Sequence, residues 1–136
     1  MPAPATAKGS CMCSLLGFEI SLPTKWVAHC HCSMCRRAAG AAFVTWVSVA
    51  DWNFRITRGA DHLTWHRSSI EGRRGFCNQC GSTLLFKSTK WPGETHLTLA
   101  NFDEPVDRAP QAHAFWDTHV DWVTITDDLP KKNAPP

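Results

Sequence analysis

The feature that most constrains this 136-residue chain is its seven cysteines, which fall into three clusters. The clusters are Cys11-Met12-Cys13, Cys30-His31-Cys32-Ser33-Met34-Cys35 and Cys77-Asn78-Gln79-Cys80-Gly81. An odd number of cysteines cannot form a complete set of disulfides. Residues 1–8 lack the apolar core of an export signal, so we expect a cytoplasmic protein whose thiols stay reduced. The clusters therefore predict metal binding.

The spacing within each cluster indicates how the sulfur atoms could meet. In an extended strand, residues two apart share a face, with their Cβ atoms about 7 Å apart. Zinc with Zn–S bonds of about 2.3 Å needs sulfurs about 3.8 Å apart, so each Cys-x-Cys pair requires a local bend. The Cys-x-x-Cys pair requires a tight turn, and Gly81 tolerates the positive φ that such a turn often demands.

Seven thiolates divide into a set of three and a set of four. One set is local in sequence and can form a site by itself: Cys30, Cys32 and Cys35. The other set joins the start of the chain to its middle: Cys11, Cys13, Cys77 and Cys80. Four sulfurs are typical of structural zinc, whereas three protein ligands with an open position are typical of catalytic zinc. The alternative is a single zinc ion with three buried or bystander cysteines.

Short segments rich in β-branched and aromatic residues predict a mainly β fold. One short helix is expected over residues 33–39, closed by Gly40. The connections are too short for crossover helices, so the sheets should be antiparallel. The expected strands are residues 15–20, 26–32, 43–49, 54–57, 63–67, 74–77, 83–87, 96–100, 113–116 and 122–125.

Length and charge exclude several classes of partner. The 14 basic and 12 acidic residues are scattered, so no nucleic-acid partner is expected. Uncharged stretches are too short to cross a bilayer, so no membrane partner is expected either. We expect a flexible N-terminal arm (1–8), one zinc-binding domain (9–130) and a flexible tail (131–136). The oligomeric state is left open.

Several runs of residues carry a resemblance to a known family. They are Gly9-Ser10-Cys11-Met12-Cys13, His29-Cys30-His31-Cys32-Ser33-Met34-Cys35-Arg36-Arg37, Gly40-Ala41-Ala42-Phe43, Arg74-Gly75-Phe76-Cys77-Asn78-Gln79-Cys80-Gly81-Ser82, His113-Ala114-Phe115-Trp116 to Trp122, and Asp128-Leu129-Pro130. Over residues 9–130 the chain resembles the glutathione-dependent formaldehyde-activating enzymes.

That resemblance implies a β-tent, in which small antiparallel sheets are clamped by a four-cysteine zinc. It places the structural zinc on Cys11, Cys13, Cys77 and Cys80, and a second zinc on Cys30, Cys32 and Cys35. It also implies glutathione as cosubstrate and a carbon–sulfur lyase activity similar to that of S-(hydroxymethyl)glutathione synthase. The four-plus-three division of the cysteines by spacing agrees with this assignment.

An open three-sulfur zinc has a chemistry that fits such an activity. Metal coordination deprotonates a thiol, and the thiolate can add to an aldehyde carbonyl to give a hemithioacetal. The predicted function is a zinc-dependent lyase or synthase. It would act on an adduct of glutathione, or another thiol, with formaldehyde or another small aldehyde. The catalytic residues would be the ligands of the open zinc: Cys30, Cys32 and Cys35.

Residues near this set are candidates for binding the substrate. Arg36 could pair with glutathione carboxylates, or could equally lie at a solvated helix end. His31 alternates with the cysteines and faces away from the metal in a regular strand, so it would reach the hemithioacetal oxygen only if the strand bends. Surface or structural roles are expected for Arg73 and Arg74. Two carboxylates are acid–base candidates by residue type: Glu71 and Asp117.

Two other function classes remain open. A β-tent domain can be a zinc-stabilised protein-binding module without enzymatic activity, because fold alone does not give function. The second cysteine set argues against this class, since a scaffold needs only the four-sulfur clamp. A thiol oxidoreductase of similar fold would need a free catalytic cysteine beyond the last cluster, and no cysteine follows Cys80.

Overall fold

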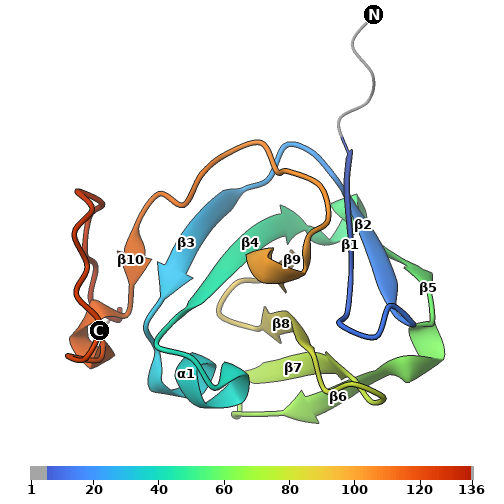
Figure 1. Ribbon diagram of the computed structural model, residues 1–136, viewed down its shortest axis with the longest axis horizontal. Helices are drawn as coiled ribbons and strands as arrows, with labels where there is room; N and C mark the ends of the chain where they lie inside the picture. The colour runs from blue at the N-terminus through green and yellow to red at the C-terminus, as the bar shows by residue number, and fades with distance from the viewer. Residues whose placement is uncertain (1–5, 136) are drawn as a thin grey trace, which may run out of the picture.

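Strands provide most of the regular structure in the computed structural model, which describes residues 6–135. A three-stranded sheet has the order β1-β2-β5, formed by β1 (Thr6–Ser10), β2 (Gly17–Ser21) and β5 (Phe54–Arg58). A seven-stranded sheet has the order β10-β3-β4-β9-β8-β7-β6. Its strands are β3 (Trp26–Cys30), β4 (Val44–Ala50), β6 (Leu63–Arg67), β7 (Gly72–Cys77), β8 (Thr83–Ser88), β9 (Glu94–Thr98) and β10 (His113–Ala114). Figure 1 shows the larger sheet curving from β10 on the left to β6 at the bottom, with β1, β2 and β5 on the right.

The expected class, a mainly β fold of small antiparallel sheets with little helix, is confirmed. All neighbouring strands pair antiparallel except β10, which pairs parallel with β3 over two residues. Helix α1 (Ser33–Ala39) has the expected bounds. It ends at Gly40, whose φ of 62° is left-handed and suits glycine. Single 3-10 turns account for the other helical residues that the structure describes.

The ordered domain extends beyond the expected boundaries at both ends. Strand β1 begins at Thr6, and Ala7 is buried opposite Ile20, although residues 6–8 were expected in a flexible arm. At the other end, Lys131 forms a β-bridge with His113, so the first residue of the expected flexible tail is paired with the sheet. Both ends are held by backbone hydrogen bonds to strands, which a composition rich in proline and alanine does not reveal. Residues 1–5 and 136 of the expected arm and tail lie outside the described residues.

Other expected strands also need correction, since those expected over 15–20, 26–32 and 113–116 span Gly17–Ser21, Trp26–Cys30 and His113–Ala114. The ninth strand spans Glu94–Thr98 instead of 96–100, and residues Leu99–Asn101 form a 3-10 turn. Residues 122–125 contain no strand, although their composition is β-branched and aromatic. Trp122 is 69% exposed, so no neighbouring strand covers this segment.

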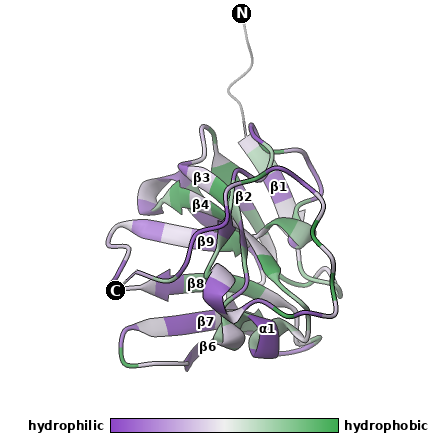
Figure 2. Cartoon of the chain, turned by 90° about the vertical axis from the view of Figure 1, so that its left-hand side faces the viewer, coloured by the Kyte–Doolittle hydropathy of each residue, from purple (hydrophilic) through white to green (hydrophobic). Residues whose placement is uncertain are grey.

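The core has two parts, and each contains cysteines. The larger part includes Phe18, Ile20, Val47 and Leu97, together with Cys11 and Cys77. The smaller part consists of Cys30, Cys35, Val44 and Trp46. Hydrophobic colouring is plain on β4, whereas much of β7 is hydrophilic (Figure 2). No helix among residues 6–135 is long and apolar enough to cross a membrane.

Candidate metal centres

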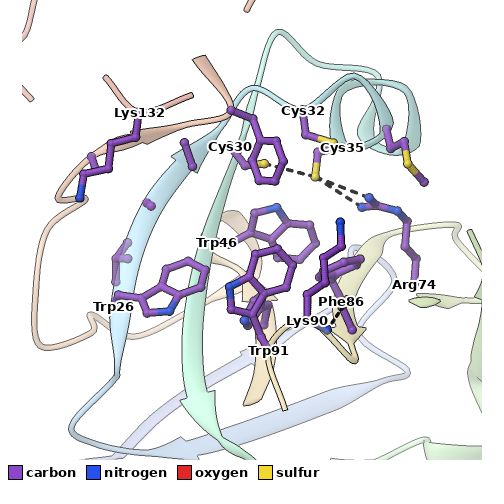
Figure 3. A pocket seen from close by; sticks show the side chains of 18 of the residues that line it. Trp26, Cys30, Cys32, Cys35, Trp46, Arg74, Phe86, Lys90, Trp91 and Lys132 are labelled. Atoms are coloured by element: carbon purple, nitrogen blue, oxygen red, sulfur yellow. Dashed lines mark hydrogen bonds between the residues drawn. The ribbon is translucent and has the colours of Figure 1, made fainter. Parts of the chain in front are cut away.

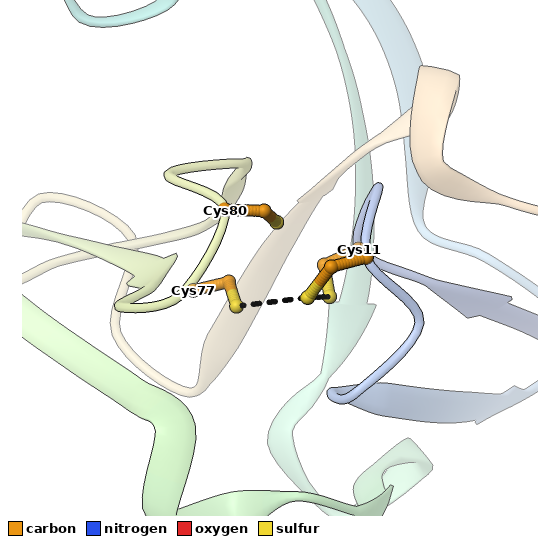
Figure 4. Close-up of side chains that lie close together, drawn as sticks. Cys11, Cys77 and Cys80 are labelled. Atoms are coloured by element: carbon orange, nitrogen blue, oxygen red, sulfur yellow. Dashed lines mark hydrogen bonds between the residues drawn. The ribbon is translucent and has the colours of Figure 1, made fainter.

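Four cysteines from two distant turns form a compact sulfur cluster: Cys11, Cys13, Cys77 and Cys80. Their sulfur atoms all lie within 4.8 Å of one another. The Cys11 and Cys13 sulfurs are 3.5 Å apart, and the Cys13 and Cys77 sulfurs are 3.8 Å apart. Figure 4 shows Cys11 facing Cys77 and Cys80 across the gap between the two turns. Because tetrahedral zinc needs sulfurs about 3.8 Å apart, the four-sulfur set fits this ion.

The first half of this cluster is a turn, not the extended pair that the Cys-x-Cys spacing suggested. The Cys11 N–H donates to the Leu16 carbonyl at 3.0 Å, and the Ser14 N–H donates to the Cys11 carbonyl at 3.0 Å. Ser14 has φ of 68°, which reverses the chain directly after Cys13. The turn closed by the Ser14 N–H and the Cys11 carbonyl supplies the bend that brings the two sulfurs within ligand distance.

The second half has the tight turn that its spacing requires. The Gly81 N–H donates to the Cys77 carbonyl at 2.8 Å, and Gly81 has φ of 77°. The Gln79 N–H points at the Cys77 sulfur at 3.4 Å. The Met12 N–H donates to the Ser82 hydroxyl at 2.9 Å, which joins the two turns directly. The cluster is therefore held by backbone contacts as well as by its sulfurs.

The second sulfur set lies where β3 ends and α1 begins. Cys30 is the last residue of β3, Cys32 precedes the first helical residue, and Cys35 lies in the first helical turn. Their sulfurs also lie within 4.8 Å of one another, and the Cys30 and Cys35 sulfurs are 3.5 Å apart. The change from strand to helix at Cys32 supplies the bend, because it turns the next sulfur back toward Cys30.

The crowding of these three thiols favours a bound cation. Hydrogen bonds from Cys30 and Cys35 lower the pKa of the Cys32 thiol to about 2. Hydrogen bonding to Cys32, followed by hydrogen bonding to Cys35, raises the pKa of the Cys30 thiol far above its usual value. Protons and charge are therefore shared unequally among three sulfurs that cannot all ionise so close together. A soft divalent cation allows all three to be thiolates, so the donor set fits zinc.

Arg74, for which the sequence predicted a surface or structural role, is a charged neighbour of this set. Its Nη1 and Nη2 atoms lie 3.7 and 3.6 Å from the Cys35 sulfur, and the side chain is buried at 7% exposure. The guanidinium also lies over the Phe86 ring, 4.8 Å from its centroid. Adjacent residues of a strand point to opposite faces, so either Arg73 or Arg74 had to point inward. That alternation was the signal in the sequence that one of the two arginines would be buried.

A cavity of about 800 Å³ opens beside the three-sulfur set. All three cysteines of the set line it, whereas the four-sulfur cluster does not. Five aromatic side chains contribute to its walls: Trp26, Trp46, Phe86, Trp91 and Phe115. Three cationic side chains line it from different sides: Arg74, Lys90 and Lys132. Figure 3 shows the aromatic rings gathered below Cys30 and Cys35, with Arg74 reaching toward the Cys35 sulfur.

The two substrate-binding candidates from the sequence do not line this cavity. His31 is 2% exposed, and its Nε2 lies 2.8 Å from the Nδ1 of His113. Desolvation by burial, followed by the charge of His113, lowers the pKa of His31 to about 4, so it is a neutral core residue. The Arg36 Nε is buried without a hydrogen-bond partner among the described residues. Glu71 lines the cavity and pairs with Lys90 at 3.9 Å, while Asp117 accepts the Ala134 N–H away from it.

Comparison with known proteins agrees with these features. The family model described as "Glutathione-dependent formaldehyde-activating enzyme" matches residues 6–118, a span that contains all seven cysteines. A Halomonas elongata protein, named as a candidate glutathione-dependent formaldehyde-activating enzyme, is 29% identical over 125 residues, covering 87% of this chain and 80% of that protein. A crystal structure of a Rhodobacter sphaeroides protein is similar with a TM-score of 0.63 and 25% identity, covering 72% of this chain and 89% of that one. The chain belongs to the family of glutathione-dependent formaldehyde-activating enzymes.

Proposed function

We propose that this protein is a zinc-dependent carbon–sulfur lyase or synthase that joins glutathione to formaldehyde or another small aldehyde, and separates them again. The observation that carries the proposal is the position of the three-sulfur set on the wall of a large cavity. The four-sulfur cluster has a complete ligand set and lies away from that cavity. One cluster is therefore suited to holding the fold, and the other to meeting a substrate.

Each cluster would hold one zinc ion. In the three-sulfur set, zinc would supply a Lewis acid with a vacant position and would lower the pKa of an incoming thiol. Three thiolates bring much negative charge to one place, and the buried guanidinium of Arg74 offsets part of it at Cys35. Arg74 also fixes the position of the Cys35 side chain, because both of its terminal nitrogens contact the same sulfur.

The cavity walls provide the remaining functions. Glutathione carries two carboxylates, and the cationic side chains of Arg74 and Lys132 line the cavity near the sulfur set, where they would bind them. The aromatic side chains offer apolar surface beside the reacting carbonyl. In the forward direction, the thiol sulfur bonds to the carbonyl carbon, and the thiol proton ends on the carbonyl oxygen. The reverse direction breaks the same carbon–sulfur bond.

Exchange spectroscopy by NMR tests this function at equilibrium, where free formaldehyde and its glutathione adduct give separate signals. We expect zinc-loaded protein to increase the exchange rate well above the rate in buffer. The Cys35→Ser variant should leave the rate at the buffer value, because it removes one ligand of the three-sulfur set. An exchange rate that zinc-loaded wild-type protein does not change would disprove the proposed reaction.

Replacing Arg74 with glutamine is expected to weaken the second metal site without unfolding the domain. Loss of the guanidinium removes the charge that favours the Cys35 thiolate. Zinc should therefore leave this site at a lower chelator concentration. A charge-assisted contact contributes about 1.5–3 kcal/mol, so the required chelator concentration should fall by roughly tenfold or more. Chelator titration followed by elemental analysis measures this. Arg73→Gln is the matched control, since Arg73 is exposed and lies over Trp65 on the other face. Equal zinc retention in the two variants would show that Arg74 has no such role.

A further inference from the structure

We infer that the site prefers aldehydes carrying an aromatic or comparably bulky apolar group over formaldehyde. This inference rests on the proposed function, because it concerns the second substrate of the same reaction. It is drawn from the volume of the cavity, from its extension along the sheet, and from the side chains at the end farthest from the cysteines.

The cavity is too large for formaldehyde to be the partner that it was shaped to bind. Pockets of roughly 300–1,000 Å³ take drug-sized ligands, and this cavity holds about 800 Å³. Formaldehyde has two non-hydrogen atoms and is little larger than water, whose share of liquid volume is ~30 Å³. Glutathione itself lies at the smaller end of the drug-sized range. Its adduct with formaldehyde would therefore leave much of this apolar space unfilled.

The unfilled space extends away from the sulfur set along the sheet. Cys30 and Trp26 lie on the same face of β3, four residues apart, which corresponds to about 13 Å at ~3.3 Å per residue. At the level of Trp26, one row crosses four strands: Trp26 on β3 lies opposite Ser48, Ser48 opposite His96, and His96 opposite Phe86. Phe86 lies beneath Arg74 and so borders the sulfur set, whereas Trp26 and His96 form a distal compartment at the other end of the row.

Aromatic rings surround the distal compartment. Trp91 lies over the row, with ring centroids 5.5 Å from His96 and 6.1 Å from Phe86. The Trp26 and His96 rings meet edge to face at 4.7 Å. Trp26 and Trp91 are only partly buried, so they keep ring surface available to a guest. Aromatic groups pack well in such offset and edge-to-face arrangements.

The side chains of His96 and Ser48 in the distal compartment are already paired with Glu94. The His96 Nε2 lies 2.9 Å from a Glu94 carboxylate oxygen, and Glu94 also accepts the Ser48 hydroxyl at 2.7 Å. Lys90 faces Glu71 at 3.9 Å. Arg74, by contrast, lies against the sulfur set, and Lys132 belongs to the segment that pairs with β10 beside Cys30. The glutathione carboxylates therefore find cationic partners near the sulfurs, while an apolar substituent of the aldehyde can occupy the distal compartment.

The reaction itself is unchanged by this assignment. The glutathione sulfur bonds to the aldehyde carbon, the carbonyl π electrons move to the oxygen, and the thiol proton ends there. No oxidant or reductant is consumed. With the sulfur at the cysteine set and the glutathione carboxylates near Arg74 and Lys132, the substituent on the aldehyde carbon is directed along the sheet toward Trp26 and Trp91.

Comparing formaldehyde with phenylacetaldehyde tests the inference by the same NMR exchange measurement. The quantity is the acceleration, the exchange rate with zinc-loaded protein divided by the rate in buffer. We expect an acceleration at least tenfold larger for phenylacetaldehyde. The Trp91→Ala variant should bring the ratio of the two accelerations close to one. Trp52→Ala is the matched control, because Trp52 is 83% exposed and does not line the cavity, and it should keep the wild-type ratio.

Binding without turnover gives a second readout. By isothermal titration calorimetry, S-benzylglutathione should bind at least tenfold more tightly than S-methylglutathione, and Trp91→Ala should remove the difference. Acceleration of formaldehyde exchange with no preference for phenylacetaldehyde would overturn this inference and leave the proposed function standing. No acceleration of either aldehyde would overturn both. A preference that survives in Trp91→Ala would place the apolar group outside the distal compartment and would also overturn the inference.

Discussion

Replacing Cys80 with serine is expected to leave the protein insoluble or unfolded. The four-sulfur cluster joins turns that are far apart in sequence, since Cys13 and Cys77 are separated by 64 positions. Its loss removes a long loop closure together with the binding energy of a structural zinc. That energy is roughly 10–16 kcal/mol in small zinc domains, against a net stability of ~5–15 kcal/mol for a typical domain. Soluble yield, zinc content and melting temperature measure the effect.

Cys35→Ser is the matched variant and should behave differently. Cys30 and Cys35 are separated by only five positions, so their site constrains little of the chain. A buried serine hydroxyl costs about 1–3 kcal/mol, which a typical domain tolerates. We expect this variant to stay folded, to keep one zinc and to lose thiol binding and aldehyde exchange. A folded Cys80→Ser beside an unfolded Cys35→Ser would reverse the roles assigned to the two clusters.

Complete removal of metal should unfold the domain and not merely inactivate it. Without a cation, the cluster at the two turns contains four sulfurs within 4.8 Å, whose ionised forms repel one another. The contacts between the turns that remain include the Met12–Ser82 hydrogen bond, and these are too few to replace a metal clamp. Circular dichroism and thermal melting with and without chelator measure the change.

The control for that experiment is the addition of zinc back to the chelated protein, which should restore the original melting curve. The Cys35→Ser variant provides a second comparison, because chelator should unfold it as completely as it unfolds the wild type. A melting curve unchanged after elemental analysis has shown all metal removed would contradict a structural role for the four-sulfur cluster.

Local features of the fold were predictable from the sequence because their causes are local. The bounds of α1 follow from the turn at Cys32 and from Gly40, and those of β6 from a short β-branched and aromatic run. Strand β1 was missed because Thr6–Ser10 has small and polar residues with little strand preference of its own. It forms because Ala7 packs into the core and pairs with β2, which is a tertiary effect.

The sequence predicted the two sulfur sets better than it predicted their surroundings. Spacing groups cysteines, because ligands close in sequence must lie close in space. The inward orientation of Arg74 depends on the register of β7 against β8, where Arg74 lies opposite Phe86. Likewise, the partner of His31 is His113, 82 positions away on β10. Such pairings arise from how the strands assemble, and the cavity between them could not be derived from spacing.

Cobalt substitution followed by glutathione titration tests the central claim most directly, namely that one sulfur set is closed and the other is open to a thiol. We predict two cobalt ions per chain and a sulfur-to-metal charge-transfer band that strengthens as glutathione is added. S-methylglutathione should leave the band unchanged, and Cys35→Ser should show one cobalt and no response. A single cobalt in the wild type, or an equal response to glutathione and S-methylglutathione, would contradict the account.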